Sequence, residues 1–300
     1  VLPRVLPTFG VPKTEGRFWK VQPGSLAKAP VTVRAPGAAY PRDNYDLTTD
    51  TYATVGKGLE GLIPDEQSRQ YGDTIRLEQA RAVQKVNQIL RREEVDLAGT
   101  LFNTSTWALS GNTGLAVTNE WDDPTNATPA TDIVAGKNGI RARVGDWAEM
   151  GLKLCLLMPW NVRRNVELCT SVRTGLGGAY TDPAFKNANI PDQLLASALG
   201  VDEIITAGQM YKSSGTDASP TLSDIWSDEY AMLFVRSVPN QPEIMGLGVT
   251  FVWNDFGGEY EVKTYREEQT SSGVVQVNRN SQQKITDSNF AFLLGNVSTN

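Results

Sequence analysis

The chain has 300 residues, of which 40% are hydrophobic, so it can bury a sizeable core in one large domain or two small ones. It contains no histidine, which excludes Ser-His-Asp and Cys-His catalysis as well as zinc sites of the H-E-x-x-H type. The net charge is −6, but residues 1–42 carry seven basic side chains and one acidic one, so the remainder of the chain is strongly acidic.

Residues 1–42 are predicted to form an extended N-terminal arm. This segment holds seven of the 16 prolines, and proline at that density excludes helix and central strand because it fixes φ and lacks an N–H. A basic arm on an acidic body indicates docking onto an acidic neighbour or facing a polyanion. Phe18 and Trp19 argue against a disordered tail and suit a protein groove, so docking onto a neighbour is the preferred interpretation.

Residues 43–72 are predicted to form a long two-stranded hairpin. Tyr45 and Leu47, then Tyr52 and Val55, precede a glycine-rich tip, "GKGLEG", which contains Lys57. The segment is too polar and too thin to have its own core, and an isolated hairpin is only marginally stable in water. Something outside its own strands must therefore support it.

Residues 74–102 are predicted to form a single long helix. Apolar side chains recur at spacings of three and four residues, and Asp73 or Thr74 can cap the start. About 28 residues rising ~1.5 Å each give a rod of roughly 40 Å. A charged cluster in its later half fits either a solvated helix face with i,i+3 and i,i+4 pairs or a charge contact between subunits. The members of this cluster are Arg91, Arg92, Glu93 and Glu94.

The rest of the chain is predicted to be loop-rich over residues 103–137 and then to mix helices and strands. Residues 152–160, "LKLCLLMPW", are predicted to form a buried strand. The longest apolar run, residues 154–160 within it, is about a third of the ~20 residues needed to cross a bilayer. A helix capped by Asn161 and ended by Gly175 is predicted to follow. The chain has only two cysteines, so a disulfide framework is not expected and a reducing compartment is. Further predicted elements are a helix at 191–199, a strand directly after it, a buried strand at 230–235 and β-structure from 247 onward.

No segment carries a recognisable catalytic, cofactor or metal site. "GLGGAY" at residues 175–180 lacks the G-x-G-x-x-G spacing, and no glycine stands where a phosphate loop around "GKG" requires it. The acidic pairs have charged or turn-like surroundings, without the apolar pocket that would raise a carboxyl pKa. The sequence therefore predicts a protein that is not an enzyme and that binds no cofactor or metal.

The order of these segments resembles the major capsid proteins of tailed bacteriophages, which have the HK97-like fold. The resemblance covers nearly the whole chain, and its most specific part is "GVDEIITAG", "DIWSDEYAMLFV", "EYEVKTYREE" and "NFAFLLGNV". It implies an α+β fold. The implied parts are an extended N-terminal arm (1–42), an E-loop hairpin (43–72), a P-domain with a long spine helix and a β-sheet (73–145), an α/β A-domain (146–246) and a β tail that returns to the P-domain (247–300).

The resemblance implies a structural protein that self-assembles into the icosahedral head shell around a phage genome. Its partners would be copies of itself in pentamers and hexamers, a portal protein, scaffold and decoration proteins, and packaged double-stranded DNA that it faces without reading the sequence. It would have no membrane partner, would assemble in the cytoplasm of the bacterial host and would end in the virion. The residues expected at subunit interfaces are Phe18, Trp19, Tyr45, Tyr52, Lys57, Arg91, Arg92, Glu93 and Glu94.

Two other functions stay open. The first is an encapsulin-type nanocompartment shell, which has the same fold but would favour a shorter N-terminal arm. The second is a histidine-free enzyme or binding domain, for which no site can be nominated. Some members of the capsid family also crosslink an E-loop lysine to an asparagine of an adjacent subunit, assisted by a buried glutamate. For Lys57 we expect the simpler outcome, a solvent-exposed lysine at a hairpin tip.

Overall fold

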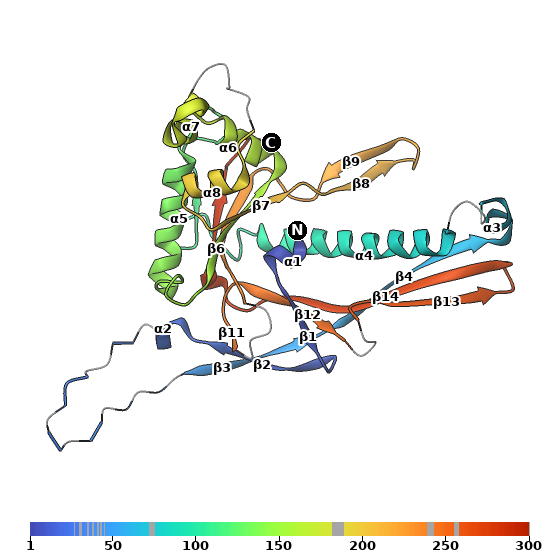
Figure 1. The fold of residues 1–300 in the computed structure, drawn as a ribbon, viewed down its shortest axis with the longest axis horizontal. Helices are drawn as coiled ribbons and strands as arrows, with labels where there is room; N and C mark the ends of the chain where they lie inside the picture. Colours follow the sequence, from blue (N-terminus) through green and yellow to red (C-terminus); the bar gives the residue numbers. More distant parts are fainter. Residues whose placement is uncertain are drawn as a thin grey trace.

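The chain folds into an α/β body from which several extended pieces project (Figure 1). The fold is that of a computed structural model. The described residues are 1–26, 28–29, 32–34, 36–37, 39–40, 42, 44, 46–71, 76–181, 189–238, 243–254 and 258–299.

Helices and strands follow each other irregularly along the chain. The helices are α1 (Leu2–Val5), α2 (Pro23–Leu26), α3 (Asp65–Tyr71), α4 (Leu77–Leu101), α5 (Pro129–Val144), α6 (Trp160–Leu168), α7 (Thr170–Leu176) and α8 (Asp192–Leu199). The strands are β1 (Thr8–Val11), β2 (Glu15–Val21), β3 (Leu47–Ala53), β4 (Val55–Pro64), β5 (Gly114–Ala116), β6 (Lys153–Pro159), β7 (Glu203–Ala207), β8 (Met210–Gly215), β9 (Pro220–Asp224), β10 (Tyr230–Arg236), β11 (Glu243–Ile244), β12 (Gly248–Trp253), β13 (Glu261–Glu267), β14 (Ser272–Ile285) and β15 (Ala291–Gly295).

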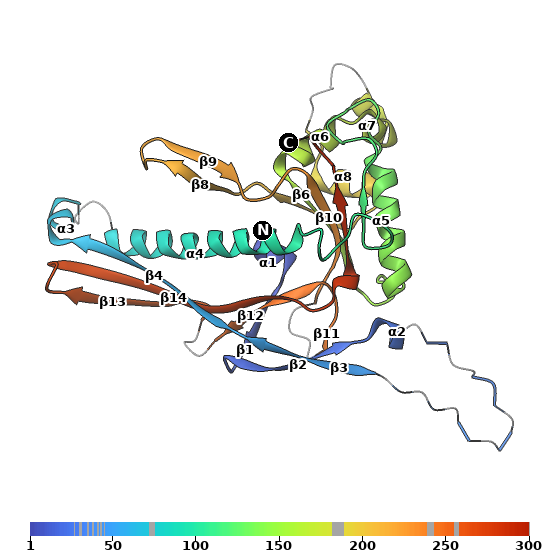
Figure 2. The same ribbon diagram turned by 180° about the vertical axis from the view of Figure 1, so that it is seen from behind.

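A five-stranded sheet in the order β5-β15-β10-β6-β7 forms the centre of the body. β10 is antiparallel to β15 and β6, whereas β6 is parallel to β7. The central strands are apolar along nearly their whole length because both faces of the sheet are covered. Helices α5 to α8 cover one face, and α1 with the C-terminal end of α4 covers the other (Figure 2). The strands predicted at 152–160 and 230–235, and the helix at 191–199, are confirmed.

A long helix and a long sheet extend from this body in the same direction (Figure 1). β4 and β13 pair with opposite edges of β14, and α4 lies over β4 and β14. The long helix predicted at 74–102 is confirmed as α4, whose 25 residues give a rod of about 38 Å. Its buried side chains begin only at Ile89, so the first half of the helix extends beyond the body. The proposed caps, Asp73 and Thr74, lie outside the described residues.

The prediction of an extended arm over residues 1–42 is wrong for its first half. Pro3 lies in the first turn of α1, where a missing N–H is tolerated, and Leu2, Val5 and Leu6 are buried in the core between α4 and the central sheet. β1 runs parallel to β12, and β2 pairs antiparallel with β3. The other prolines of this part precede or follow these strands and interrupt no hydrogen-bond ladder, so their density does not exclude regular structure.

The prediction of a hairpin over residues 43–72 is wrong in its pairing. β3 pairs with β2, whereas β4 pairs with β14 along all of its ten residues. "GKGLEG" is therefore the middle of a strand, and Lys57 stands opposite Arg279. Alternation in the sequence predicts strands here but carries no information on their partners. The hairpin that does form consists of β2 and β3, and the described residues of the connection between them, within 22–46, project away from the body (Figures 1 and 2).

A helix, α5, occupies part of the region that the sequence predicts to be loop-rich. Its buried side includes two glycines, Gly136 and Gly139, so the apolar spacing that would reveal a helix is weak. A Cβ at Gly139 would lie 2.6 Å from the Phe292 ring. The glycine therefore allows this ring to contact the helix backbone directly.

The helix predicted between Asn161 and Gly175 is in fact two helices, α6 and α7. They are separated at Cys169, whose extended backbone (φ −60°, ψ 127°) interrupts the helical hydrogen bonds. Asn161 lies inside α6 and does not cap it; its side-chain amide donates to Asp228 at 2.6 Å. The predicted β-structure after residue 247 is confirmed, with β12 to β14 in the long sheet and β15 in the central sheet.

Candidate functional site

The charged cluster of α4 lies at the junction between this helix and the long sheet. Glu93 is fully buried; the Lys57 ammonium lies 3.1 Å from its Oε1, and the Ser281 hydroxyl donates to the same oxygen. The guanidinium of Arg279 lies 3.5 Å from Oε2, and Gln283 donates to the main-chain carbonyl of Glu93 at 2.8 Å. One carboxylate therefore connects α4, β4 and β14.

Strand register brings these charges together. Lys57 and Arg279 are cross-strand partners, so their side chains point to the same face of the sheet, the face that α4 covers. Arg279 is itself buried; it donates to the Tyr260 hydroxyl and lies 3.6 Å from the Glu259 carboxylate. Burial raises the pKa of Tyr260, although the Arg279 guanidinium beside it acts in the opposite direction.

Lys57 is not the solvent-exposed tip lysine that the sequence predicts. Its side chain is only 29% exposed and is paired with Glu93 from within a strand. Asn278 and Asn280 are its nearest asparagines on β14, and alternation along the strand places them on the face away from Lys57. The geometry therefore provides a structural ion pair and brings no asparagine of this strand to the amine.

Glu94 connects the same helix to the body. Its Oε1 accepts a hydrogen bond of 2.8 Å from the indole N–H of Trp226, and both side chains are buried. Neither interpretation of the charged cluster therefore holds for Glu93 and Glu94, which are neither solvated nor on the surface. Arg91 and Arg92 are exposed, and Arg92 forms an i,i+4 pair of 3.0 Å with Asp96.

The described residues contain no group of three or more His, Cys, Asp or Glu side chains that could hold a metal ion. Burial raises the pKa of the Cys155 and Cys169 thiols to about 12, so neither is a nucleophile near neutral pH. The carboxylates of Glu93 and Glu94 are occupied by partners of the same chain. No described helix is both long enough and apolar enough to cross a membrane.

The residues predicted at subunit interfaces are distributed between the interior and the surface. Phe18 and Tyr52 are buried against Phe251, with ring centroids 5.1 Å and 4.7 Å away, so they belong to the core of the chain itself. Trp19 is 51% exposed and, with Arg91 and Arg92, remains a predicted contact. Tyr45 lies outside the described residues.

Several exposed apolar side chains were not singled out by the sequence. Trp160 is 60% exposed at the start of α6, although its position after "LCLLMP" predicts burial. Val33 and Tyr40, between β2 and β3, are 86% and 75% exposed. Met210 and Leu222, on the β8–β9 hairpin, are 42% and 51% exposed. The polar sequence of that hairpin has no apolar alternation that could have indicated it.

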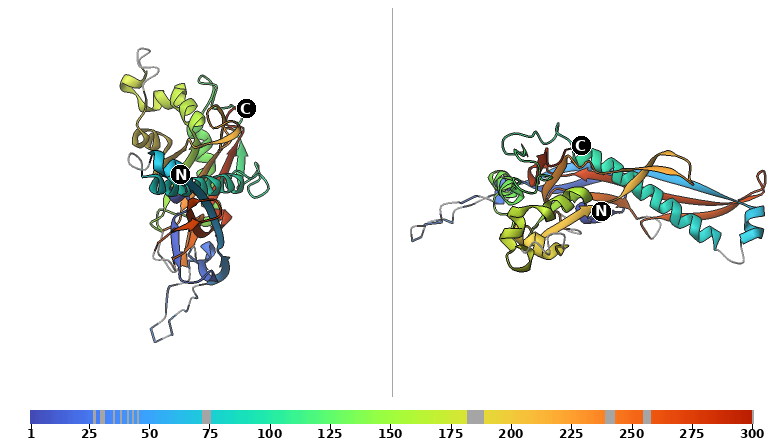
Figure 3. Two further views of the ribbon diagram at one scale, coloured as in Figure 1. Left: turned by 90° about the vertical axis from the view of Figure 1, so that its right-hand side faces the viewer. Right: turned by 90° about the horizontal axis from the view of Figure 1, so that it is seen from above.

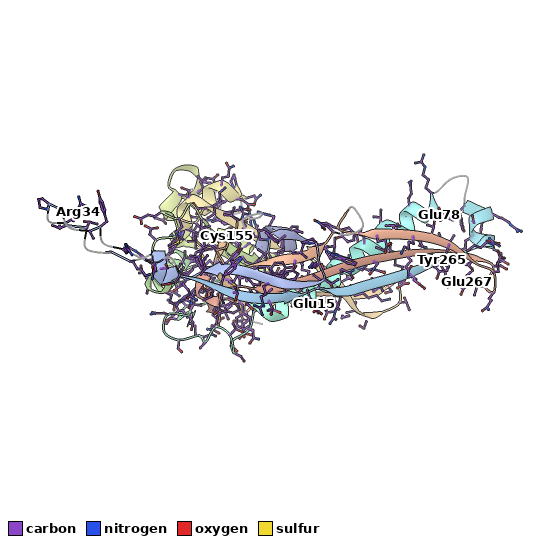
Figure 4. The ribbon with its side chains drawn as sticks, turned by 90° about the horizontal axis from the view of Figure 1, so that it is seen from below. Glu15, Arg34, Glu78, Cys155, Tyr265 and Glu267 are labelled. Atoms are coloured by element: carbon purple, nitrogen blue, oxygen red, sulfur yellow. The ribbon has the colours of Figure 1, made fainter. Side chains whose placement is uncertain are left out.

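Val33 and Tyr40 lie on the β2–β3 connection and Met210 and Leu222 on the β8–β9 hairpin, two parts that project from the body in different directions, whereas Trp160 lies on the body itself. Seen from below, Arg34 lies at one extremity, Cys155 in the body, and Glu78, Tyr265 and Glu267 toward the other extremity (Figure 4). The end-on and top views show that the long helix and its sheet form a narrow extension (Figure 3). The chain is therefore elongated, and exposed large apolar side chains such as Val33, Tyr40 and Tyr265 lie on its projecting parts.

The comparisons with known proteins agree on this architecture. No family model and no curated protein matches the sequence. A phage-related protein from Bordetella bronchiseptica RB50 matches 98% of the chain over 90% of its own length, with a TM-score of 0.68 and 17% identity. The capsid of the cyanophage P-SCSP1u is similar over 96% of this chain and 85% of its own, with a TM-score of 0.58 and 9% identity. A virus-like particle from Pyrococcus furiosus is similar over 98% of this chain and 91% of its own, with a TM-score of 0.51 and 10% identity.

At these low identities the likeness concerns the fold, and it extends over nearly the whole chain in each case. The central sheet, the long helix and the long sheet are all included, because no more than 4% of the chain is left unmatched. The chain therefore has the α+β, HK97-like capsid fold that its sequence predicts.

Proposed function

We propose that the chain is the structural subunit of a closed icosahedral shell, the head of a tailed phage. The observation that carries the proposal is the likeness, over 96% of the chain, to the capsid of the cyanophage P-SCSP1u. The proposal includes a non-enzymatic role, because every buried carboxylate of the α4 cluster is used to hold the chain together.

The elongated shape supports this proposal. A shell subunit has to be wide and flat and has to contact several neighbours, which a stiff helix and a long sheet allow. The first half of α4 and the β2–β3 connection have little core of their own, so contacts with other copies would stabilise them. Many individually weak contacts in one lattice add up to a stability that no single pair provides.

The proposed partners follow from the same function. They are copies of the chain in pentamers and hexamers, a portal protein, scaffold and decoration proteins, and double-stranded DNA. The net charge of −6 would repel the phosphate backbone, so packaged DNA would not adhere to the shell wall. Assembly would take place in the cytoplasm of the bacterial host, and the mature chain would be part of the virion.

A nanocompartment shell of the encapsulin type is the second candidate. The likeness to a virus-like particle from Pyrococcus furiosus, over 98% of the chain, keeps a closed particle other than a phage head as an alternative. The two candidates differ in content: a phage head encloses double-stranded DNA, and a compartment encloses protein cargo. Treating purified particles with nuclease after opening them, and measuring the released nucleic acid, separates the two.

Electron microscopy and analytical ultracentrifugation of the purified full-length chain test the proposal. We expect capsomers or closed particles with icosahedral symmetry. A chain that stays monomeric at all concentrations, with and without the other head proteins of its phage, would contradict the proposal. A particle without nucleic acid but with a protein cargo would replace the first candidate with the second.

A further inference from the structure

The β8–β9 hairpin is an element without a core. All described residues of β8 are exposed, and in β9 only Ser223 is partly buried. The hairpin leaves the body beside the end of β7 and projects in the same general direction as α4 (Figures 1 and 2). An isolated two-stranded sheet is marginally stable in water, so a hairpin of this kind gains stability when another surface covers it.

One face of this hairpin lies next to the exposed Trp160 of α6. Met210 is the cross-strand partner of Asp224, and Lys212 is the partner of Leu222, so these four side chains share a face. Met210 and Asp224 also line a hollow of roughly 330 Å³, together with Trp160. We call the exposed apolar side chains Trp160, Met210 and Leu222, with the acidic Asp224 and Asp228 beside them, the hairpin strip.

The charges around the hairpin strip are unbalanced. Lys212 is neutralised by Asp217 at 2.6 Å, so Asp224 and Asp228 leave the strip acidic. The arginines on the other side of Trp160 are already paired, since Arg163 and Arg164 both contact Glu167 and Arg163 also contacts Asp192. A complementary surface should therefore be apolar with basic side chains at its edge.

We propose that the hairpin strip is the docking surface for a second copy of this chain. The proposal rests on the proposed shell function and adds the surface through which neighbouring subunits contact each other. A tryptophan that is 60% exposed beside a hollow is the type of side chain that contributes most to protein interfaces.

The segment of the second copy that fits the strip lies between β2 and β3. It exposes Val33 and Tyr40, and its three basic residues, Lys28, Arg34 and Arg42, outnumber its two acidic ones, Asp43 and Asp46, so the segment carries a formal charge of +1. It projects on the side of the molecule opposite to the β8–β9 hairpin (Figures 1 and 2). Contacts between two different surfaces at opposite ends of a subunit are heterologous, and such contacts form closed rings when the rotation between copies closes.

Site-specific photocrosslinking tests which molecule occupies the strip. Leu222 is replaced by the photoreactive amino acid p-benzoylphenylalanine, particles are assembled and irradiated, and the crosslinked peptides are identified by mass spectrometry. The expected product joins residue 222 to the segment 28–46 of another copy, which is shown to be another copy by mixing isotopically labelled and unlabelled chains. A product that joins residue 222 to a different protein, or no product between chains, overturns the proposal.

A variant pair tests whether the contact is needed. Trp160→Ser combined with Leu222→Ser should lower the yield of closed particles about tenfold or more, because the loss of one central tryptophan contact alone is worth at least that factor. The thermal unfolding midpoint of the subunit should not change, because both side chains are exposed. The matched control is Val134→Ser, which removes a side chain that is 50% exposed on α5, away from the strip.

The outcomes separate the role of the hairpin strip from the shell function. Normal particles from the double variant would overturn the role of the strip and leave the shell function intact. Wild-type protein that never forms particles would contradict the shell function itself.

Discussion

Glu93 is buried with two cationic partners, and its replacement measures how strongly the long helix is held to its sheet. We expect Glu93→Gln to lower the free energy of unfolding by about 3 kcal/mol, because the Lys57 ammonium and the Arg279 guanidinium lose their counter-charge in a water-poor site. Urea unfolding followed by circular dichroism measures the change. The control is Asp96→Asn, which removes an exposed i,i+4 pair and should cost less than about 0.5 kcal/mol. Equal effects of the two substitutions would mean that burial does not matter here.

The reactivity of the two cysteines tests whether their thiols are buried. Their thiol pKa values are raised to about 12 by burial, so almost no thiolate is present at pH 8. We expect no reaction of the native chain with Ellman's reagent over an hour at that pH, and complete reaction of both thiols in urea. Rapid reaction of either Cys155 or Cys169 in the native chain would show that its surroundings open readily.

The lowered pKa of Asp50 predicts how the stability of the fold depends on pH. The hydrogen bond from Lys284, 2.8 Å long, is the largest cause that lowers the pKa of Asp50 below its ordinary value of 3.8. A lowered folded-state pKa stabilises the fold above the ordinary pKa, and that stabilisation is lost as the pH falls through the folded-state pKa. The stability advantage of wild type over Asp50→Asn should therefore shrink between about pH 4 and about pH 2. A constant advantage over this range would exclude the ion pair as its source, and Lys284→Gln should weaken the same pH dependence, while the Thr51 N–H and the Lys20 charge still lower the Asp50 pKa.

At the scale of elements, the α5 helix shows why some parts of the fold escape sequence analysis. Strands such as β6 and β10 are predictable because they are buried on both faces and read as continuous apolar runs. Part of the buried side of α5 consists of Gly136 and Gly139, which leave room for the Phe292 ring of β15. This contact is between residues far apart in the chain, so no local sequence pattern indicates it. Partners of strands are equally non-local, so β4 is recognisable as a strand while its pairing with β14 is not.

Two glycine substitutions in helices should change stability in opposite directions. Gly139→Ala in α5 places a Cβ 2.6 Å from the Phe292 ring and 2.9 Å from a main-chain oxygen, so we expect a loss of about 1–2 kcal/mol. Gly99→Ala in α4 has no atom within 4 Å of the new Cβ, so better helix propensity should raise stability by about 0.5–1 kcal/mol. Thermal and urea unfolding measure both. A stabilised Gly139→Ala variant would show that Phe292 does not pack against this helix.

The candidate site shows the same division between local and non-local information. Composition alone excludes histidine-based chemistry, and the charged run in α4 is visible in the sequence. Its burial is not, because it depends on Lys57 and Arg279 from two strands far apart in the chain. Trp160 is misjudged for the opposite reason: it follows a buried run, but the chain turns into a helix at the surface there.

At the scale of the whole molecule, the N-terminal segment has two parts with different physical roles. Residues 1–11 belong to the core, since Val5 and Leu6 are fully buried and β1 pairs with β12. The described part of the β2–β3 connection is largely exposed and contributes apolar side chains that the chain itself does not cover. Deleting all of residues 1–42 would therefore mix a folding defect with an assembly defect, and the two parts have to be removed separately.

Separate deletions should give two different failures. Removing residues 1–11 exposes the core between α4 and the central sheet, so we expect unfolded or aggregated protein by circular dichroism and size-exclusion chromatography. Replacing residues 23–45 by a short Gly-Ser turn should preserve the fold, because Val21 and Leu47 are direct cross-strand partners and a tight turn can join them. This second variant should remain a soluble subunit with an unchanged thermal midpoint but should form no closed particles under the electron microscope. Normal particles from it would show that the connection does not hold neighbouring copies together, and a folded protein without residues 1–11 would show that these residues are not part of the core.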